Sequence, residues 1–369
     1  MRRTRVLIPA LALTFAVVAA ACGSSSDSGT TGPIAVASIA SSTGSASAYG
    51  IAQQNGTVLA VTELADGSID LSTYDDLSDP QAGTDAMKRA LSEGATVVLG
   101  PTLSPVAAAA DPFAQAVGVP VLGVTNATLD MAAIGNLIWR VSLSENAMVS
   151  ASVNYAESKK SVKTATLIWE PSDGYSAGSA ASFRAAAKAN GITITSEQTY
   201  VDGSTSVDVV AGAALASSPD AVFFALRSAV ADDFLVATAS TKALRVGGNG
   251  FNSAAVVASS GAGADGLIVS GSWNINSPNA MSKRFVEAYT KANNVAPDSF
   301  AAQGYAAIQI LLAAMKKAKT SSSADIQVAL SKIGTVETVL GPFGYDAQNE
   351  PTYPAAVQIV QGGAFTLAS

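Results

Sequence analysis

Hydrophobic and polar positions follow a regular rhythm between residues 34 and 122. Apolar, β-branched runs predict strands, and alanine-rich stretches with a helical repeat predict helices between them. In the helix expected at 81–93, for example, Met87, Ala90 and Leu91 fall on one face. Strands that alternate with helices indicate a mainly parallel sheet covered by helices on both faces. The strands are expected at 34–39, 68–74, 96–99 and 119–122, and the helices at 49–64, 81–93 and 104–117.

The same rhythm begins again after the polar stretch "ESKKSVKT". The segments 95–113 and 219–237 echo one another, because each contains an apolar strand, a short polar turn and an alanine-rich helix. These turns place Ser104 in one unit, and Arg227 with Ser228 in the other, at the carboxyl end of a strand. Ligands bind at that edge in open α/β sheets, so two such units predict a cleft with polar groups on both sides. The second unit's strands are expected at 164–169, 192–195, 221–225 and 245–247, and its helices at 176–190, 206–216 and 229–241.

Beyond Trp273 the pattern predicts two long helices, at 278–292 and 300–318, and a shorter one at 324–333. The chain then ends in a strand, a polar turn and a hairpin.

The first 32 residues have a different composition. A basic start with three arginines precedes an almost purely apolar run from 6 to 21, and small residues lead into Cys22. This arrangement is typical of a secretory signal, predicted at 1–21, and the apolar run is short for a spanning helix. The Ser/Gly-rich residues after Cys22 predict a flexible tether at 22–32.

Charge and residue inventory exclude several function classes. The chain has 21 basic and 28 acidic residues, and removing a signal with three arginines and no acids leaves a net charge near −10, which disfavours nucleic acid as a partner. With no histidine and one cysteine, the chain has no Cys-His nucleophile, no Cys/His zinc site and no internal disulfide. No catalytic or nucleotide motif can be read, "VGGNG" lacks the full dinucleotide pattern, and we expect no cofactor or metal and no enzyme activity.

The segment Ala19-Ala20-Ala21-Cys22 resembles the lipobox of bacterial lipoproteins. The resemblance implies that the Cys22 thiol receives a lipid and anchors the protein to the outer face of the cell membrane. The alternative is a buried free cysteine behind an ordinary signal peptide.

Several longer segments, taken in order, resemble solute-binding proteins of the branched-chain amino-acid type, which feed ATP-driven (ABC) importers. They are "SSTGSASAYG", "YDDLSDPQAGTDAMKRALSEGATVVLGPTLSPVAAAADPFAQAVGVPVLGVTN", "WEPSDGYSAG" and "VLGPFGYDAQNEP". The resemblance implies a type I periplasmic-binding fold, an α/β fold of two doubly wound lobes that close around a ligand by a hinge. Three crossovers would lie near 159–163, 272–276 and 338–342. Lobe 1 would comprise 33–160 with 275–339, and lobe 2 would comprise 161–274 with 340–369.

Lobe 1 supplies the first candidate ligand residues. Ser104 follows a strand and opens a helix, so we expect it to cap that helix and to present amide hydrogens to an anion. A cap without a ligand is the alternative, but the resemblance implies that Ser104 binds a ligand carboxylate. In "GVTNAT" the resemblance implies that backbone groups of Thr125 contact the ligand. The family also binds the ligand with a threonine side chain at the position of Ala127, so in this chain Asn126 or Thr128 takes over that role. The plain alternative for this segment is a turn.

Two tyrosines match the family's aromatic positions. Tyr49 ends the first loop, and Tyr175 lies in "SDGYSAG". The resemblance implies that both pack on the ligand, as aromatic walls do in small-molecule clefts. The alternative for each is a half-buried surface tyrosine.

Lobe 2 departs from the family. Amino-acid binders carry a glutamate for the ligand ammonium after the strand at 244–247, where this chain has the neutral Asn249. Arg227 stands where the family often has an aromatic residue, and it is a candidate to bind the ligand. The alternative is a surface arginine that forms an ion pair with Asp232 or Asp233. Glu170 is a further candidate for an ammonium.

Together these features predict a lipoprotein that binds a small amino acid, amide or carboxylate and delivers it to the permease subunits of an importer. A ligand-sensing lipoprotein that signals to a membrane receptor is the alternative, and a lipid-anchored hydrolase is a third.

Overall fold

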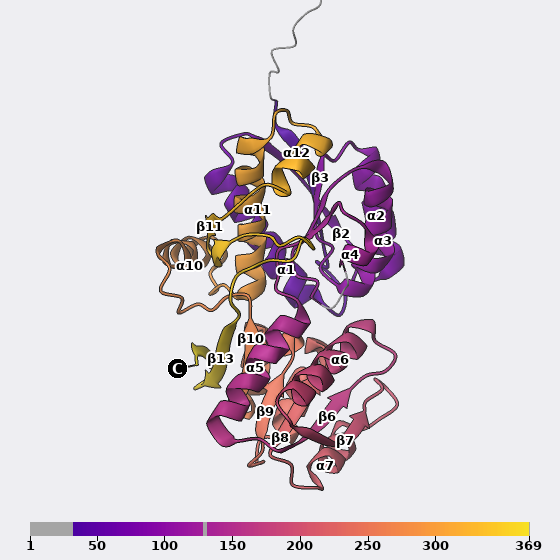
Figure 1. Cartoon of the computed structure of the whole chain (residues 1–369), viewed down its shortest axis with the longest axis vertical. Coiled ribbons are helices and arrows are strands. Elements are labelled where there is room, and N and C mark those ends of the chain that lie inside the picture. The colour runs from indigo at the N-terminus through magenta and orange to yellow at the C-terminus, as the bar shows by residue number, and fades with distance from the viewer. Residues whose placement is uncertain (1–31, 128–130, 369) are drawn as a thin grey trace, which may run out of the picture. The chain divides into compact units, whose positions relative to one another are not determined.

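The computed structural model describes residues 32–127 and 131–368. Cys22 and the predicted signal and tether therefore lie outside the described residues, except for Gly32, and so does Thr128. The described chain forms two large sheets, each covered by helices (Figure 1). Within this part of the chain, none of the helices has the length and apolar character required to cross a bilayer.

The first sheet has five parallel strands in the order β2-β1-β3-β4-β5. Its two faces are covered by α1, α2, α3, α10, α11 and α12, whose apolar sides close two hydrophobic clusters. The strands are β1 (Ile34–Ala40), β2 (Ile69–Asp75), β3 (Val97–Leu99), β4 (Val121–Gly123) and β5 (Ile138–Arg140). The helices are α1 (Ser47–Leu64), α2 (Pro80–Ser92), α3 (Ser104–Val117), α10 (Ala280–Asn293), α11 (Ser299–Lys317) and α12 (Ser323–Leu330), and the short α4 (Met131–Ile134) precedes β5.

The second sheet has seven strands in the order β14-β13-β10-β9-β8-β6-β7. Its strands are parallel except at β13, which runs antiparallel to both of its neighbours. The strands are β6 (Thr164–Trp169), β7 (Thr193–Thr199), β8 (Ala221–Ala225), β9 (Leu244–Gly247), β10 (Leu267–Gly271), β13 (Ala356–Gln361) and β14 (Ala364–Leu367). The helices of this lobe are α5 (Glu145–Lys160), α6 (Gly174–Ala189), α7 (Val207–Leu215), α8 (Ser228–Ala237) and α9 (Ala254–Ser260), with short 3₁₀ turns at Asn249–Phe251 and Gly261–Ala264.

Burial explains why these segments become central strands. Every residue of β8 is buried, and Phe223 and Phe224 point to opposite faces of the sheet because side chains alternate along a strand. Phe223 stacks on Phe183 with ring centroids 4.9 Å apart, whereas Phe224 packs on Phe251. One apolar strand thus fills the core on both sides of the sheet.

Small residues let α11 pack closely against α1. A Cβ atom added at Gly56 would lie 2.0 Å from the carbonyl oxygen of Ala301, and one at Gly304 would lie 2.1 Å from that of Gln53. Only glycine allows this approach, and it brings the start of α11, with Phe300, next to Tyr49 of α1.

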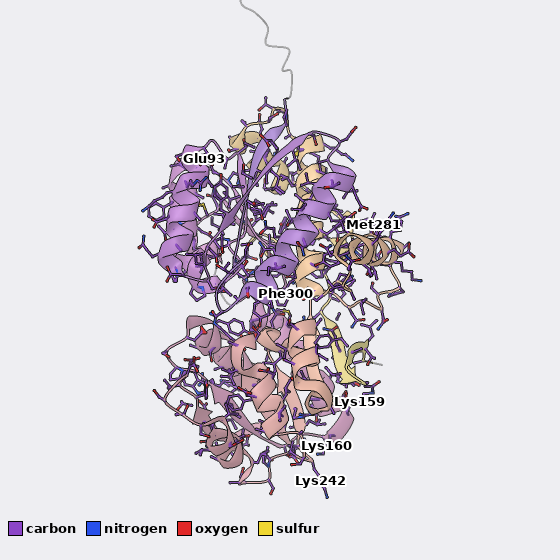
Figure 2. The ribbon with its side chains drawn as sticks, turned by 180° about the vertical axis from the view of Figure 1, so that it is seen from behind. Glu93, Lys159, Lys160, Lys242, Met281 and Phe300 are labelled. Atoms are coloured by element: carbon purple, nitrogen blue, oxygen red, sulfur yellow. The ribbon has the colours of Figure 1, made fainter. Side chains whose placement is uncertain are left out.

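The structure corrects two predicted lobe boundaries. Helix α5, whose residues the predicted boundaries place in lobe 1, packs on the second sheet, where Val149 and Val153 share a core cluster with Phe183. Its last residue, Lys160, donates a hydrogen bond of 2.7 Å to the carbonyl of Lys242, and Figure 2 shows both lysines at the same end of the molecule. The first crossover therefore precedes residue 145 and does not lie at 159–163.

The third crossover also moves. Strands β11 (Val336–Thr338) and β12 (Gly341–Phe343) form a two-stranded sheet. Phe343, the last residue of β12, and Tyr353, further along the chain, are both buried in the core of the first lobe. The chain joins the second sheet only at β13, next to β10 (Figure 1). Residues 341–353 thus pack on lobe 1, and the crossover follows them instead of lying at 338–342. The second passage lies between β10 and α10, at residues 272–279.

Candidate functional site

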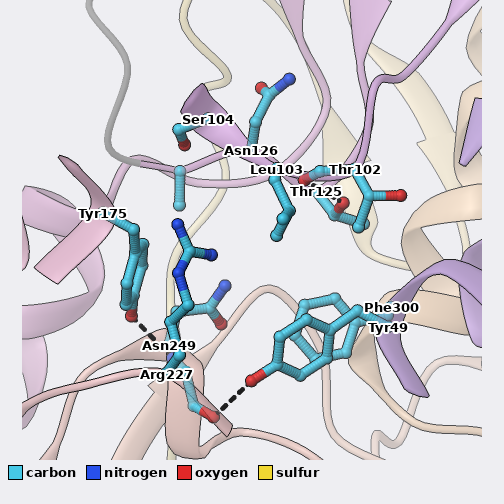
Figure 3. Close-up of a pocket in the computed structure, with 12 residues that line it drawn as sticks. Tyr49, Thr102, Leu103, Ser104, Thr125, Asn126, Tyr175, Arg227, Asn249 and Phe300 are labelled. Carbon is cyan, nitrogen blue, oxygen red and sulfur yellow. Dashed lines mark hydrogen bonds between the residues drawn. The ribbon is translucent and has the colours of Figure 1, made fainter. Parts of the chain in front are cut away.

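A small pocket lies where the carboxyl ends of strands from both sheets meet (Figure 3). Its cavity volume is ≈ 30 Å³, room for a few water molecules at most. Apart from Glu170, all the predicted ligand residues that the structure describes line it. The lining residues are Tyr49, Thr102, Leu103, Ser104, Thr125, Asn126, Ala127, Tyr175, Arg227, Asn249, Gly250 and Phe300.

Ser104 lies in this pocket as the first residue of α3. The residue before it, Leu103, occupies the N-cap position, so the expectation that Ser104 caps the helix is wrong by one residue. Pro105 follows in the first turn, where its missing N–H costs the helix nothing. The first turn of α3 still directs backbone N–H groups and the positive end of the helix dipole toward this side of the pocket.

The loop after β4 supplies the neighbouring wall. The hydroxyl of Thr125 lies 2.9 Å from the carbonyl oxygen of Thr102 and 3.0 Å from Oε1 of Gln53. Asn126 donates from Nδ2 to the carbonyl of Pro101 at 3.0 Å, and its Oδ1 is buried with no hydrogen-bond partner among the described residues. These contacts fix the loop against Pro101 and Thr102, which follow β3, and against Gln53 of α1.

Arg140 forms a hydrogen bond to the same loop, and this role was not predicted from the sequence. It is 1% exposed, and its Nη1 donates 2.6 Å to the backbone carbonyl of Asn126. Its Nε pairs with the carboxylate of Glu350 at 2.8 Å. A buried arginine that is paired and hydrogen-bonded in this way holds a loop in one conformation.

Arg227 is the charged residue of the pocket lining. Its guanidinium forms a two-pronged ion pair with Asp173, through Nε and, at 2.8 Å, through Nη2. This partner replaces the expected Asp232 or Asp233. The guanidinium also lies over the ring of Tyr175, 5.2 Å from its centroid, and its side chain is 19% exposed. Arg227 is therefore positioned over the pocket and not on the outer surface.

Glu145 is the main feature of the site that sequence analysis missed. It is the first residue of α5 and is 1% exposed. Its Oε1 accepts hydrogen bonds from the hydroxyls of Tyr175 at 3.0 Å and Ser179 at 2.6 Å, and from the backbone N–H of Asn249 at 3.1 Å. Burial raises the pKa of this carboxyl, and the three donors partly oppose the rise.

The Glu145 carboxylate thus fixes two residues of the pocket lining, Tyr175 and Asn249, by hydrogen bonds. The Tyr175 hydroxyl also lies 2.6 Å from the N–H of Gly250, so one buried carboxylate orders both the tyrosine and the turn at 249–251. Gly248 permits this arrangement, because a Cβ there would lie 2.3 Å from Oε1 of Glu145.

Tyr49 joins the two lobes at the edge of the pocket. Its hydroxyl donates to the carbonyl of Gly250 at 2.6 Å and accepts from the N–H of Ser228 at 3.0 Å. Its ring packs on Phe300, with centroids 4.4 Å apart. Burial raises the pKa of Tyr49 to about 12, so the hydroxyl keeps its proton at neutral pH.

One other candidate does not belong to this site, and a second cannot be placed. Glu170 follows β6 but does not line the pocket, and its carboxylate accepts a hydrogen bond from Ser172 at 3.2 Å. Thr128 lies outside the described residues. Asn249 does line the pocket, and its Oδ1 accepts a hydrogen bond of 3.4 Å from Asn252.

The chemistry of the pocket is that of a binding site. Its lining combines aromatic and aliphatic walls with hydroxyl, amide and guanidinium groups. The described residues contain no cluster of His, Cys, Asp or Glu side chains suited to a metal ion. The lining offers groups that hold and orient a small molecule.

Two α/β lobes with a polar pocket at the carboxyl ends of their strands define a type I periplasmic-binding fold, as predicted. The family model described as "Periplasmic binding protein" matches residues 33–364. The chain belongs to this family. Because its members are binding proteins and not enzymes, the prediction of a non-enzymatic protein is confirmed.

Known relatives agree with this assignment. A Leu/Ile/Val-binding protein homolog (homolog 3) from Brucella melitensis is 24% identical over 337 residues, which cover 87% of this chain and 89% of that protein. The substrate-binding protein LivJ from Streptococcus pneumoniae, solved with isoleucine, has a TM-score of 0.82 and 24% identity over 90% of this chain and 97% of its own. A solute-binding protein from R. palustris, solved with benzoate, has a TM-score of 0.79 and 23% identity over 91% and 95%. The resemblance to the branched-chain amino-acid type is therefore confirmed.

Proposed function

We propose that this protein is an extracytoplasmic substrate-binding lipoprotein of an ABC importer, and that it captures a small carboxylate or amide in the pocket between its lobes. Among the described residues, the lining contains the Arg227 guanidinium, which is ion-paired with Asp173, and no acidic side chain, and this is the observation that carries the proposal. An anionic or amide group is stabilised by this guanidinium and by the N-terminal turn of α3 at Ser104.

The lining also opposes a buried ammonium. Asn249 is neutral, and the buried carboxylate of Glu145 already accepts hydrogen bonds from Tyr175, Ser179 and the Asn249 N–H. A ligand ammonium placed here would lack a counter-charge of its own, which is costly in a desolvated site. We therefore expect weaker discrimination for a free α-ammonium than amino-acid binders show.

Two relatives support a carboxylate as the shared feature of the ligands. LivJ from S. pneumoniae was solved with isoleucine and the R. palustris protein with benzoate, and both ligands carry a carboxylate. Aromatic and aliphatic groups of this pocket, from Tyr49, Tyr175, Phe300 and Leu103, suit an apolar body on such a ligand.

Capture requires movement of the lobes. A cavity of ≈ 30 Å³ admits no solute of the size of an amino acid, so binding requires a form in which the lobes lie further apart than they do here. The bond from Tyr49 to Gly250 is made only when the lobes are close. The lipobox-like Ala19–Cys22 segment supports lipid anchoring, with the permease subunits as the partners that receive the solute.

A thermal-shift screen of small carboxylates, amides and amino acids, followed by calorimetry, tests the proposal. We expect the best ligand to carry a carboxylate or amide, and Ser104→Ala and Arg227→Ala each to weaken its binding by about 1–3 kcal/mol, the cost of unpairing a buried charged acceptor. Tight binding of leucine or isoleucine that depends on its ammonium group and is untouched by Arg227→Ala would overturn the ligand class.

A further inference from the structure

A second, larger cavity lies beside the passage of the chain from β10 to α10. Its volume is ≈ 190 Å³, and it shares no lining residue with the first pocket. The walls of this cavity, which is partly open to solvent, come from the start of α9, the segment after β10, the start of α11 and the terminal hairpin. The lining residues are Asn252, Ala254, Val257, Trp273, Asn274, Ile275, Ala296, Pro297, Asp298, Ser299, Gln358, Gly363, Ala364 and Phe365.

The size and walls of this cavity suit one aromatic ring. Cavities of about 150 Å³ with apolar walls hold a benzene molecule, so ≈ 190 Å³ accommodates a ring with a one- or two-atom substituent. Trp273 and Phe365 provide aromatic walls, and Ile275 and Val257 provide aliphatic ones.

A carboxylate lines the same cavity. Asp298 caps α11, and its Oδ1 accepts the N–H groups of Phe300 and Ala301, both at 3.0 Å. No lysine or arginine among the described residues forms an ion pair with it. Burial raises the pKa of Asp298 to about 6, so the group is mainly ionised at neutral pH although it has no cationic partner there.

Ser299 adds a second polar group. It is 4% exposed, it lines the cavity, and its hydroxyl has no hydrogen-bond partner within residues 32–127 and 131–368. A buried hydroxyl normally finds a partner, because leaving it unpaired costs free energy. The cavity is therefore lined by the Asp298 residue, and the unpaired Ser299 hydroxyl beside it is itself buried, so it reaches a ligand only if its side chain rotates.

We propose that this cavity is a second ligand site, which takes a small primary amine carrying one aromatic ring. The ring packs between Trp273 and Phe365, and the ammonium donates hydrogen bonds to the Asp298 carboxylate and, after rotation of the serine side chain, to the Ser299 hydroxyl. A cation supplies the counter-charge that Asp298 lacks, and charge-assisted hydrogen bonds are the strong ones. The first pocket, whose described lining holds Arg227 and no carboxylate, is the proposed site of a carboxylate or amide instead.

Calorimetry with benzylamine at pH 7.5 on the purified full-length protein tests this site, with benzyl alcohol as the neutral probe of the same shape. We expect benzylamine to bind at one site at least tenfold more tightly than benzyl alcohol, with a change in tryptophan fluorescence because Trp273 lines the cavity. Asp298→Asn, which keeps a helix-capping side chain, should weaken benzylamine binding at least tenfold. Asp208→Asn, at the exposed first turn of α7, is the matched control and should leave it unchanged.

A second variant separates loss of charge from loss of fold. Ala254→Leu narrows the cavity from the exposed start of α9 and keeps Asp298, and it should also weaken benzylamine binding while thermal melting stays close to that of the wild type. Arg227→Ala should leave benzylamine binding intact, so failure of this site is distinguishable from failure of the first pocket. No binding of benzylamine at 10 mM, or binding that is insensitive to both Asp298→Asn and Ala254→Leu, would overturn the proposal.

Discussion

The hydroxyl of Tyr49 donates a 2.6 Å hydrogen bond to the backbone carbonyl of Gly250, which lies 201 residues further along the chain. Tyr49 belongs to a helix of the first lobe and Gly250 to a turn of the second. The same hydroxyl accepts the N–H of Ser228 at the start of α8. A single oxygen therefore satisfies two backbone groups of the opposite lobe, and both lose their partner if the lobes separate.

Tyr49→Phe should weaken ligand binding about tenfold, or about 1.4 kcal/mol, because the closed form loses this contact while the open form loses nothing. The ring and its packing on Phe300 are kept. Calorimetry with the best ligand from the screen measures the change. Tyr155→Phe, on a helix of the second lobe, is the control and should bind as the wild type does. Unchanged affinity of Tyr49→Phe would show that the contact does not favour closure.

Much of the fold follows from local pattern. Strand β8 and helix α3 begin and end where the sequence predicts. The apolar five-residue run determines the limits of β8, and the alanine-rich stretch followed by Gly118 determines those of α3, so neither depends on distant residues. The lobe boundaries are different. Helix α5 has a small apolar face in sequence, and its assignment to the second sheet depends on Val149 and Val153 meeting Phe183, a contact that no local pattern encodes.

The site shows the same division. Ser104 and Arg227 are recognisable because each lies at the start of a helix near the carboxyl end of a strand, and Tyr49 because it matches an aromatic position of the family. Glu145 gave no such signal, because a glutamate in the first turn of a helix after a capping serine is an ordinary surface feature. Only the packing of α5 brings it beneath Asn249, 104 residues later.

Glu145→Ala should destabilise the protein by about 1–3 kcal/mol, since the Asn249 N–H and the hydroxyls of Tyr175 and Ser179 lose a shared buried acceptor. Glu145→Gln should cost less, because its amide oxygen can still accept at the position of Oε1. Denaturant unfolding of both variants measures the difference. Glu157→Ala, on the same helix but half-buried, is the control. Equal losses for the Ala variants at 145 and 157 would argue against a special role for the buried carboxylate.

Gln358 joins two buried amides at the base of the second cavity. Its Nε2 donates to Oδ1 of Asn252 at 2.7 Å, and its Oε1 accepts from Nδ2 of Asn274. Gln358→Leu should cost about 1–3 kcal/mol for each amide group left unpaired. Gln361→Leu, at the exposed end of the same strand, should change the free energy of unfolding by less than about 0.5 kcal/mol. Chemical denaturation distinguishes the two, and similar values for both would show that the amide network adds little.

Cys22→Ser tests the anchor directly. If Cys22 carries the lipid, the variant should move from the membrane fraction to the soluble fraction after export, and metabolic labelling with a radioactive fatty acid should be lost. The replacement differs from the native residue by one atom, so folding of the binding lobes should not change. A variant that stays as firmly bound to the membrane as the wild type would contradict lipid attachment at this position.

Asp298 should make the stability of the protein depend on pH. Burial raises its pKa from 3.8 to about 6, so the folded state binds a proton more tightly than the unfolded chain does. The resulting stabilisation is fully present below pH 4 and is lost as pH rises through about 6. A shift of this size corresponds to about 1–3 kcal/mol.

Asp298→Asn removes this titration and keeps a capping side chain at the start of α11. The free energy of unfolding of the wild type, relative to that of the variant, should therefore fall by about 1–3 kcal/mol between pH 4 and pH 7. Other buried acids such as Glu145 and Asp111, whose pKa values burial also raises, titrate in both proteins and cancel in the comparison. Urea unfolding at pH 4, 5, 6 and 7 provides the measurement. Parallel pH profiles for the two proteins would mean that the Asp298 carboxyl is well solvated, which would also remove the need for a cation in the second cavity.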